Sequence, residues 1–276
     1  MADSTPTSRR RRVIDLLATS DGPLSAEVLR EQLSVSLVTV RRDLETLERS
    51  GAVIRTHGGA MINSLRAERS ISERNDTNAL AKAEIAATAA SLVSPGLTVF
   101  LDAGTTTSRI AAELVTVPDL TIVTSGLNVA SVLAEAGPGT TVISTGGTLR
   151  RVNQAFLGPF AELVVSSIYA DIAFIGTDCV HTSRGLSSRT PEQNSLKRLM
   201  ISQARRPVVV ADSSKLGATW ATHWFVPSGP LELITDSRAD RATLEDFAQS
   251  ASWKLVAHEN AGAATLVDPT KIERLA

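Results

Sequence analysis

The hydrophobic pattern of residues 25–60 predicts two short helices followed by a hairpin. Apolar residues recur at helical spacing between residues 26 and 33, which indicates a first helix with one buried face. Ser34-Val35-Ser36 then interrupts the pattern. Ser36 is a suitable N-cap residue because its hydroxyl can accept a hydrogen bond from the first turn of the next helix.

The second of these helices has an apolar inner face and a basic outer face. Val40, Leu44 and Leu47 fall within about 60° of one another, because each helical residue advances by about 100°. The opposite side carries Val38, Arg42 and Arg49, with Thr39 and Arg41 on the flanks. Arginine can pair with guanine edges or phosphates, and an apolar side chain can meet thymine methyl groups. The outer face therefore suits a DNA major groove, and a solvated charged face is the alternative.

A hairpin next to this helix favours the DNA-binding alternative. Residues 52–56 are typical of a strand, and His57-Gly58-Gly59 supplies a turn that lets backbone amides approach a phosphate. We therefore predict a winged helix-turn-helix. The expected DNA contacts are Ser36, Val38, Thr39, Arg41, Arg42, Arg55, His57 and Gly58. A further helix should span residues 9–18 and end at Asp21-Gly22-Pro23, with phosphate contact expected from the Arg9–Arg12 block.

From residue 97 onward, short strands alternate with helices. The strand-like runs are LTVFLD, LTIVTS, TTVIST, DIAFIG, PVVVAD, LELITD and WKLVAH. The intervening helical segments span residues 108–115, 128–135, 159–167, 192–204 and 243–250. This alternation predicts an α/β domain with a mostly parallel sheet that helices cover on both faces. The expected boundaries are a DNA-binding domain over 1–60, a linker over 61–78 and the α/β domain over 79–276.

Several motifs resemble the DeoR-type bacterial transcriptional regulators. VSLVTVRRDLETLERSG and RTHGGA are similar to that family's N-terminal signature. LDAGTTT (101–107), STGGTLRR (144–151), FLGPFAE (156–162), FIGTD (174–178) and ADSSKLG (211–217) resemble, in order, the motifs of its effector-sensing domain. The resemblance implies a Rossmann-like fold similar to ribose-5-phosphate isomerase and CoA transferases. It also implies a repressor of carbohydrate-metabolism genes that a phosphorylated sugar controls.

The predicted effector site lies where the parallel strands end, since ligands bind there in open α/β sheets. A glycine and three hydroxyls at a helix start can bind an anion through backbone N–H groups and the helix dipole. Lys215 can supply a point charge to phosphate, and Asp178 can accept hydrogen bonds from sugar hydroxyls. The expected effector-binding residues are Asp102, Gly104, Thr105, Thr106, Thr107, Gly147, Arg150, Asp178 and Lys215.

Two other functions stay open. A sugar-phosphate isomerase needs a base that moves a proton between carbons, yet the segment 177–181 carries only one acid. Gln193 and Asn194 depart from the Glu-Ala of the regulator pattern, although Glu192 is adjacent, which leaves the effector's identity open. The third function is a DNA-binding structural protein with a vestigial second domain.

Composition adds limits to these functions. The 276 residues are 43% hydrophobic with a net charge of −1 and a mean hydropathy of +0.06, which allows a substantial core. Cys179 is the single cysteine, so an intrachain disulfide or a cysteine metal cluster is excluded. We expect no cofactor, no metal site, no membrane span and a cytoplasmic location. Double-stranded operator DNA, a phosphorylated sugar and further copies of the chain, in a homo-oligomer, are the expected partners.

Overall fold

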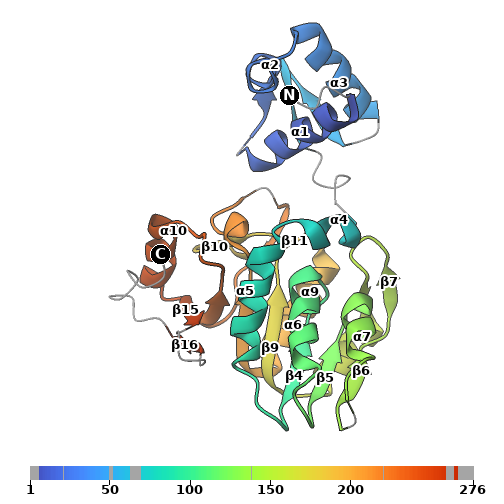
Figure 1. The fold of residues 1–276 in the computed structure, drawn as a ribbon, viewed down its shortest axis with the longest axis vertical. Coiled ribbons are helices and arrows are strands. Elements are labelled where there is room, and N and C mark those ends of the chain that lie inside the picture. Colours follow the sequence, from blue (N-terminus) through green and yellow to red (C-terminus); the bar gives the residue numbers. More distant parts are fainter. Residues whose placement is uncertain are drawn as a thin grey trace. The chain divides into compact units, whose positions relative to one another are not determined.

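The computed structural model describes residues 6–20, 22–49, 52–62, 70–137, 139–219, 221–258 and 264–266. The chain divides into two compact units, Met1–Glu68 and Arg69–Ala276. Figure 1 shows both units, with elements labelled where there is room. Each unit has a hydrophobic core of its own, so each is described separately.

The first unit is a winged helix-turn-helix, as the sequence predicts. It contains α1 (Pro6–Thr19), β1 (Leu24–Ser25), α2 (Ala26–Leu33), α3 (Leu37–Arg49), β2 (Val53–Thr56) and β3 (Gly59–Ile62). Ser34 ends α2 in the left-handed conformation, and the Ser36 hydroxyl accepts a 3.1 Å hydrogen bond from the Thr39 amide. Val40, Leu44 and Leu47 are buried, as expected from their spacing.

A short strand that the pattern did not predict connects the wing to the helices. β1 pairs antiparallel with β3, so that Ser25, the N-cap of α2, lies opposite Gly59. A Cβ at Gly59 would lie 2.1 Å from the Leu24 carbonyl oxygen. Gly59 is therefore required for this close strand pairing. Gly58, at φ +82° with open space around it, is the turn glycine that leaves its backbone accessible.

The segment between the domains differs from the expected linker over 61–78. β3 extends to Ile62, and the helix α4 spans Ile71–Asp76 within the second unit. A capping box between Ser70 and Glu73 defines the start of α4. Residues 63–69 of the expected linker lie outside the described residues, as does Asp21 of the predicted helix stop.

The second unit is built on an eight-stranded sheet with the order β16-β15-β14-β12-β9-β4-β5-β6. All neighbouring strands are parallel except β15 and β16, and Phe100 of β4 aligns with Val123 on one side and Ala173 on the other. The strands are β4 (Thr98–Leu101), β5 (Thr121–Thr124), β6 (Thr141–Ser144), β9 (Ala170–Gly176), β12 (Ala204–Val210), β14 (Leu231–Ile234), β15 (Trp253–His258) and β16 (Ala264–Leu266).

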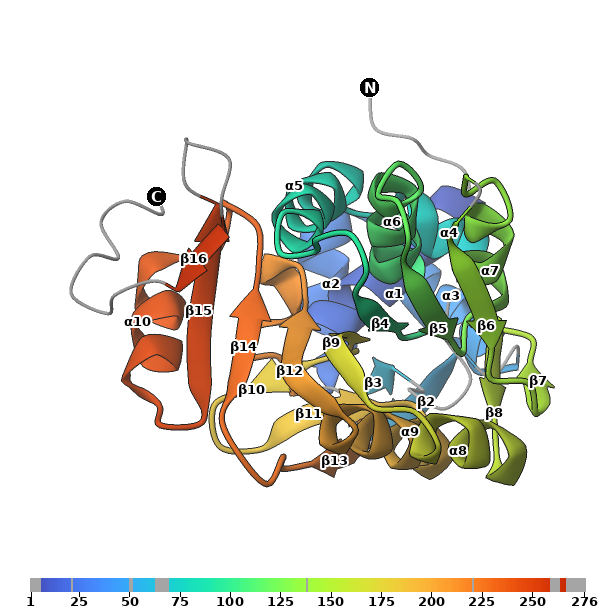
Figure 2. The same cartoon turned by 90° about the horizontal axis from the view of Figure 1, so that it is seen from below.

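Helices cover both faces of this sheet, which confirms the predicted α/β class (Figure 2). One core packs α5 (Ala79–Ala90), α6 (Thr105–Leu114) and α7 (Leu127–Leu133) against one face. The other core packs α8 (Pro159–Ser166), α9 (Pro191–Ser202) and α10 (Arg241–Gln249) against the opposite face. Alternate strand residues enter each core, because successive side chains of a strand point to opposite faces.

Smaller elements lie between the sheet strands in the sequence. β7 (Thr148–Arg150) and β8 (Ala155–Leu157) form a hairpin. β10 (Val180–His181), β11 (Gly185–Ser188) and β13 (His223–Phe225) form a small antiparallel sheet. A single 3₁₀ turn, η1 (Ser213–Lys215), follows β12. These elements follow the carboxyl ends of sheet strands, where the effector residues were predicted.

Candidate functional site

The outward face of α3 presents unpaired cations. The Val38 side chain is 74% exposed, and Val38, Arg41 and Arg42 line an open groove with Arg55 of the wing. Glu45 and Glu48 also line this groove. Within the described part of the chain, the three arginine side chains make no hydrogen bond or ion pair. Their guanidinium groups are therefore available to an anionic partner.

The other predicted DNA contacts lie around this groove. The Ser36 and Thr39 hydroxyls lie 2.7 Å apart and are both engaged at the start of α3. His57 and Gly58 form the exposed tip of the wing. Gly59, by contrast, is buried, so its lack of a side chain serves strand packing and not phosphate approach.

Two arginines of the block that was expected to contact phosphate are paired within the first unit. Arg9 and Arg10 bind the carboxylate of Asp43, a buried residue of α3, with bonds that include Arg9 Nη2 to Oδ1 at 3.3 Å and Arg10 Nε to Oδ1 at 3.0 Å. The bond to Asp43 raises the pKa of Arg9. These two arginines therefore hold α1 against α3. Arg12 is exposed, and the side chain of Arg11 lies outside the described residues.

The second unit brings the predicted effector residues to one edge of the sheet. The chain proceeds outward from β4 through β5 to β6, and in the other direction from β9 through β12 to β14 and β15. β4 and β9 are therefore the strands at which the winding order reverses, and ligands bind at such switch points in open α/β sheets. All nine predicted effector residues lie in segments that follow β4, β6, β9 or β12.

Asp102 is buried in an ion pair at this switch point. Lys197 of α9 donates to Asp102 Oδ2, and also to the Gly176 carbonyl oxygen at 2.7 Å. The Gly176 amide donates to the same Asp102 oxygen at 3.1 Å. Asp102 therefore joins β4, β9 and α9, and its Oδ2 is already occupied by protein donors. Lys197 was not among the predicted residues, because its partner Asp102 lies 95 residues away in the sequence.

The loop after β4 carries open hydrogen-bonding capacity. Gly104 is the N-cap of α6, and its carbonyl accepts bonds from Thr107 Oγ1 and Asn128 Nδ2 at 3.1 and 2.9 Å. The Thr105 and Thr106 hydroxyls make no hydrogen bond within the described residues. In the segment after β5, Asn128 Oδ1 and the buried Ser125 Oγ also lack hydrogen-bond partners among the described residues. Unsatisfied buried polar atoms are rare in folded proteins, so the segments after β4 and β5 suit a polar ligand.

Gly147 and Arg150 belong to the β7–β8 hairpin region. Gly147 has φ +104°, and a Cβ there would lie 2.6 Å from the Leu157 carbonyl oxygen, so the glycine is needed for packing of the hairpin. Arg150 Nη1 donates to Asn153 Oδ1 at 3.0 Å. Gly147 therefore serves the hairpin itself, and the Arg150–Asn153 bond joins the end of β7 to the turn that follows it.

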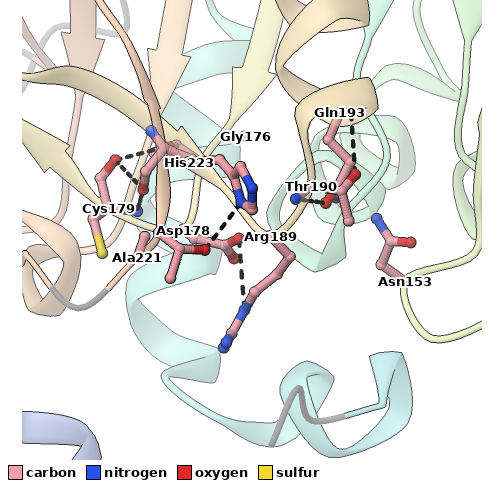
Figure 3. Close-up of polar contacts among 12 residues, drawn as sticks. Asn153, Gly176, Asp178, Cys179, Arg189, Thr190, Gln193, Ala221 and His223 are labelled. Atoms are coloured by element: carbon pink, nitrogen blue, oxygen red, sulfur yellow. Dashed lines mark hydrogen bonds and ion pairs between the residues drawn. The ribbon is translucent and has the colours of Figure 1, made fainter. Parts of the chain in front are cut away.

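Asp178 faces a cation that the sequence did not indicate. Figure 3 shows Asp178 beside Arg189, with an Nε to Oδ2 distance of 3.9 Å. On the other side of the view, Asn153 points toward Thr190 and Gln193, and the Gln193 side chain caps α9 by accepting from the Thr190 amide at 3.2 Å. The departure from the family's glutamate thus leaves a neutral amide engaged in helix capping.

Lys215 lies beside the end of β9 in a cluster with excess positive charge. Its Nζ donates to the Thr177 carbonyl oxygen at 2.8 Å and lies 3.9 Å from Asp212 Oδ2. Burial, followed by the positive charges of Lys215, Arg109 and Arg74, lowers the pKa of Lys82 to about 8, although the Asp212 carboxylate acts in the opposite direction. The cluster therefore favours an anion. Lys82 and Arg109 had no sequence signal, because nothing in their local pattern separates them from ordinary helix residues.

The described residues hold no group of three or more histidine, cysteine or acidic side chains arranged to bind a metal. Burial raises the pKa of the Cys179 thiol to about 11, so this cysteine stays protonated at neutral pH. No helix among the described residues is long and apolar enough to cross a membrane.

Comparison with known proteins identifies the family. A family model described as the DeoR-like helix-turn-helix domain matches residues 9–66, and one described as the DeoR C terminal sensor domain matches residues 77–237. The chain belongs to the DeoR family. The transcriptional regulator GlpR of Haloferax volcanii is 36% identical over 247 residues, covering 88% of this chain and 94% of that protein. The transcriptional repressor AccR of Agrobacterium fabrum is 33% identical over 217 residues, covering 78% and 83%.

Solved structures similar to this DeoR-family chain include two ribose-5-phosphate isomerases. The enzyme from Methanocaldococcus jannaschii has a TM-score of 0.37 and 18% identity, covering 50% of this chain and 55% of the enzyme. The enzyme from Neisseria gonorrhoeae has a TM-score of 0.38 and 14% identity, covering 68% and 96%. The family assignment rests on the sequence matches, and these matches describe transcriptional regulators and not isomerases.

Proposed function

We propose that this DeoR-family chain is a cytoplasmic repressor of carbohydrate-metabolism genes that binds operator DNA as a homo-oligomer and is controlled by a phosphorylated sugar. One observation carries the proposal: the same chain has two separate groups of cations. Arg41, Arg42 and Arg55 lie on the reading helix and the wing, and Lys82, Arg109 and Lys215 gather near the switch point of the α/β sheet. The name of AccR, a transcriptional repressor, supports the negative sign of regulation.

On the DNA side, Arg41 and Arg42 enter the major groove from α3, with Val38 beside them. Arg55, His57 and Gly58 contact phosphates from the wing, while Ser36 and Thr39 fix the start of the reading helix. Binding depends on all copies in the oligomer, because two reading helices spaced to match two half-sites gain affinity together. Sedimentation of the full chain with and without a selected operator checks the oligomer, and a monomer on DNA contradicts it.

The Arg42→Ala variant tests the DNA side. If Arg42 contacts a guanine edge, affinity for a DNA site selected in vitro should fall by about 1–3 kcal/mol, with specificity lost at one base position. Arg30→Ala is the matched control, because Arg30 lies on α2 and is engaged by Glu27 and Glu31. Equal affinity of wild type and Arg42→Ala in a gel-shift titration contradicts this docking of α3.

On the effector side, the phosphate binds the N-terminal amides of α6, the Thr105 and Thr106 hydroxyls and the Lys215 ammonium. The first turn of a helix leaves N–H groups without helical partners, and the helix dipole favours an anion there. Asp178, Arg150 and groups near them bind the sugar hydroxyls. Asp102 contributes by holding β4, β9 and α9 together, and Gly104, Thr107 and Gly147 contribute by shaping the loops.

A thermal-shift screen of sugar phosphates against Lys215→Ala tests this site. The variant should bind DNA normally and respond to the effector only at about ten- to a hundredfold higher concentration. This factor corresponds to the loss of one hydrogen bond to a charged group. Thr106→Val should give a weaker form of the same phenotype. Lys254→Ala, an exposed lysine on β15, is the control. Turnover of any sugar phosphate indicates an isomerase instead, and the absence of stabilisation by every compound indicates a vestigial domain.

A further inference from the structure

The helix α4 is attached to the second unit by polar contacts and not by a hydrophobic core. None of its residues, Ile71–Asp76, is buried. Its first turn is closed locally, because the Ser70 amide donates to Glu73 Oε2 at 2.9 Å and the Glu73 amide donates to Ser70 Oγ at 3.4 Å. A segment with few buried apolar contacts opens at low free energy, so what holds its C-terminal end decides whether it stays in place.

Three side chains from the effector-binding unit hold that C-terminal end. Lys82 of α5 donates to the carbonyl oxygens of Arg74 and Thr77. Arg109 of α6 donates to the Asn75 carbonyl oxygen at 3.4 Å. The last carbonyls of a helix lack helical partners and carry partial negative charge, so cations stabilise them.

The third side chain, Asn78, connects this end to the effector residues. Asn78 follows α4 at φ +53°, and its Nδ2 donates to Asp212 Oδ1 at 2.9 Å and to Ser214 Oγ at 3.2 Å. Asp212 and Ser214 are neighbours of Lys215 in the turn after β12. We call the bonds made by Lys82, Arg109 and Asn78 the α4 latch.

The α4 latch shares its charged groups with the predicted phosphate site. Arg109 lies one turn after the Thr105–Thr107 start of α6, and Lys215 and Asp212 act electrostatically on Lys82. An anion at Lys215 and the start of α6 attracts the two latch cations and repels the Asp212 carboxylate. Each of these effects weakens the hold on α4.

We propose that the α4 latch is the device through which an anionic effector acts on DNA binding: the bound anion loosens the latch and frees the helix that precedes the sensor core in the chain. The proposal rests on the proposed function, because it takes the effector to be a phosphate at this edge. In this view Asn78, Lys82 and Arg109 are positioning residues that need not touch the effector. A ligand shifts such an equilibrium only by its different affinity for the two states.

Two variants open the latch without ligand. Asn78→Gly removes the amide and keeps the positive φ accessible, and Arg109→Gln removes one cation. In each full-length variant, amide hydrogen exchange at residues 71–78 should become about tenfold faster, while exchange in β4 and β9 stays unchanged. Affinity for an operator selected in vitro should fall by a similar factor. Arg241→Gln on α10 is the control. A purely structural role predicts faster exchange throughout the sheet, and wild-type DNA affinity in both variants overturns the proposal.

Inorganic phosphate provides the ligand arm, compared with chloride at equal ionic strength. Phosphate should protect the amides of residues 105–107 and accelerate exchange at residues 71–78 in the wild type, with no further acceleration in Arg109→Gln. Protection at 105–107 with unchanged exchange at 71–78 overturns the latch and leaves the effector site standing. If residues 105–107 show no protection, the proposed effector site fails instead, and the latch is decided by the DNA affinity of the two variants.

Discussion

Replacing Asp43 by asparagine should destabilise the DNA-binding unit by about 2–4 kcal/mol. The Asp43 side chain is 3% exposed and receives bonds from Arg9 and Arg10, whose side chains are 19% and 35% exposed. Hydrogen bonds to charged groups contribute about 1.5–3 kcal/mol each, and breaking a buried pair costs about 3–5 kcal/mol. Both arginine side chains are partly exposed, so water can hydrate them when Asp43 is replaced. The loss of folding free energy should therefore be smaller than the sum of the individual bonds.

Hydrogen exchange of the slowest amides in α1 and α3 measures this loss in the full chain. A loss of about 2–4 kcal/mol corresponds to about 30- to 900-fold faster exchange of these amides. The acceleration cannot exceed the factor that corresponds to the whole free energy of unfolding of this unit. Glu45→Gln is the control on the same helix, because Glu45 makes an exposed 3.6 Å pair with Arg49 and such pairs contribute less than about 1 kcal/mol. An effect of Asp43→Asn no larger than that of Glu45→Gln would refute the assignment of Arg9 and Arg10 to the fold.

Three further predictions follow from close contacts and buried charges. Gly59→Ala should lower the melting temperature of the first unit more than Gly58→Ala. Only the new methyl group at position 59 would lie 2.1 Å from a backbone oxygen, that of Leu24; equal shifts in calorimetry contradict this. Lys197→Met should destabilise the second unit by about 3–5 kcal/mol in urea unfolding, and adding Asp102→Leu should restore part of the loss; additive losses argue against a coupled pair. The wild type should become more stable relative to Lys82→Met as the pH rises from about 8 toward 10.5. In this range the Lys82 amine has lost its proton in the folded chain but keeps it in the unfolded chain, so a rise in pH favours folding; parallel pH profiles of the two proteins contradict this.

The sequence predicted the elements that depend on local pattern. The helices α2 and α3 and the inward set Val40, Leu44 and Leu47 follow from periodicity, and every predicted sheet strand overlaps an observed one. Predicted helix starts were often late, as with α6, because Thr105–Thr107 are buried first-turn residues whose polar character suggested a loop. α4 was not predicted, since a six-residue helix without buried residues leaves no hydrophobic period to detect.

Contacts between distant segments could not be predicted in this way. The pairing of Arg9 with Asp43 was not predicted, because the two residues lie 34 positions apart in the sequence. Lys197 reaches Asp102 across 95 residues, and Asn78 reaches Asp212 across 134. Such pairs are set by strand order and helix placement. A charge pattern along the chain therefore identifies candidate cations without indicating which of them the fold itself uses.

The pairing of β1 with β3 has a consequence for how the reading surface can change. Ser25 starts α2 and also lies opposite Gly59 of the wing, so main-chain hydrogen bonds determine the separation between the helix pair and the wing tip. The outward side chains of α3 take no part in this strand pairing. If Val38 and Arg42 contact bases as proposed, exchanging them changes the base preference while the spacing between the helix pair and the wing stays the same. Docking geometry and sequence preference are, in this unit, separately variable properties.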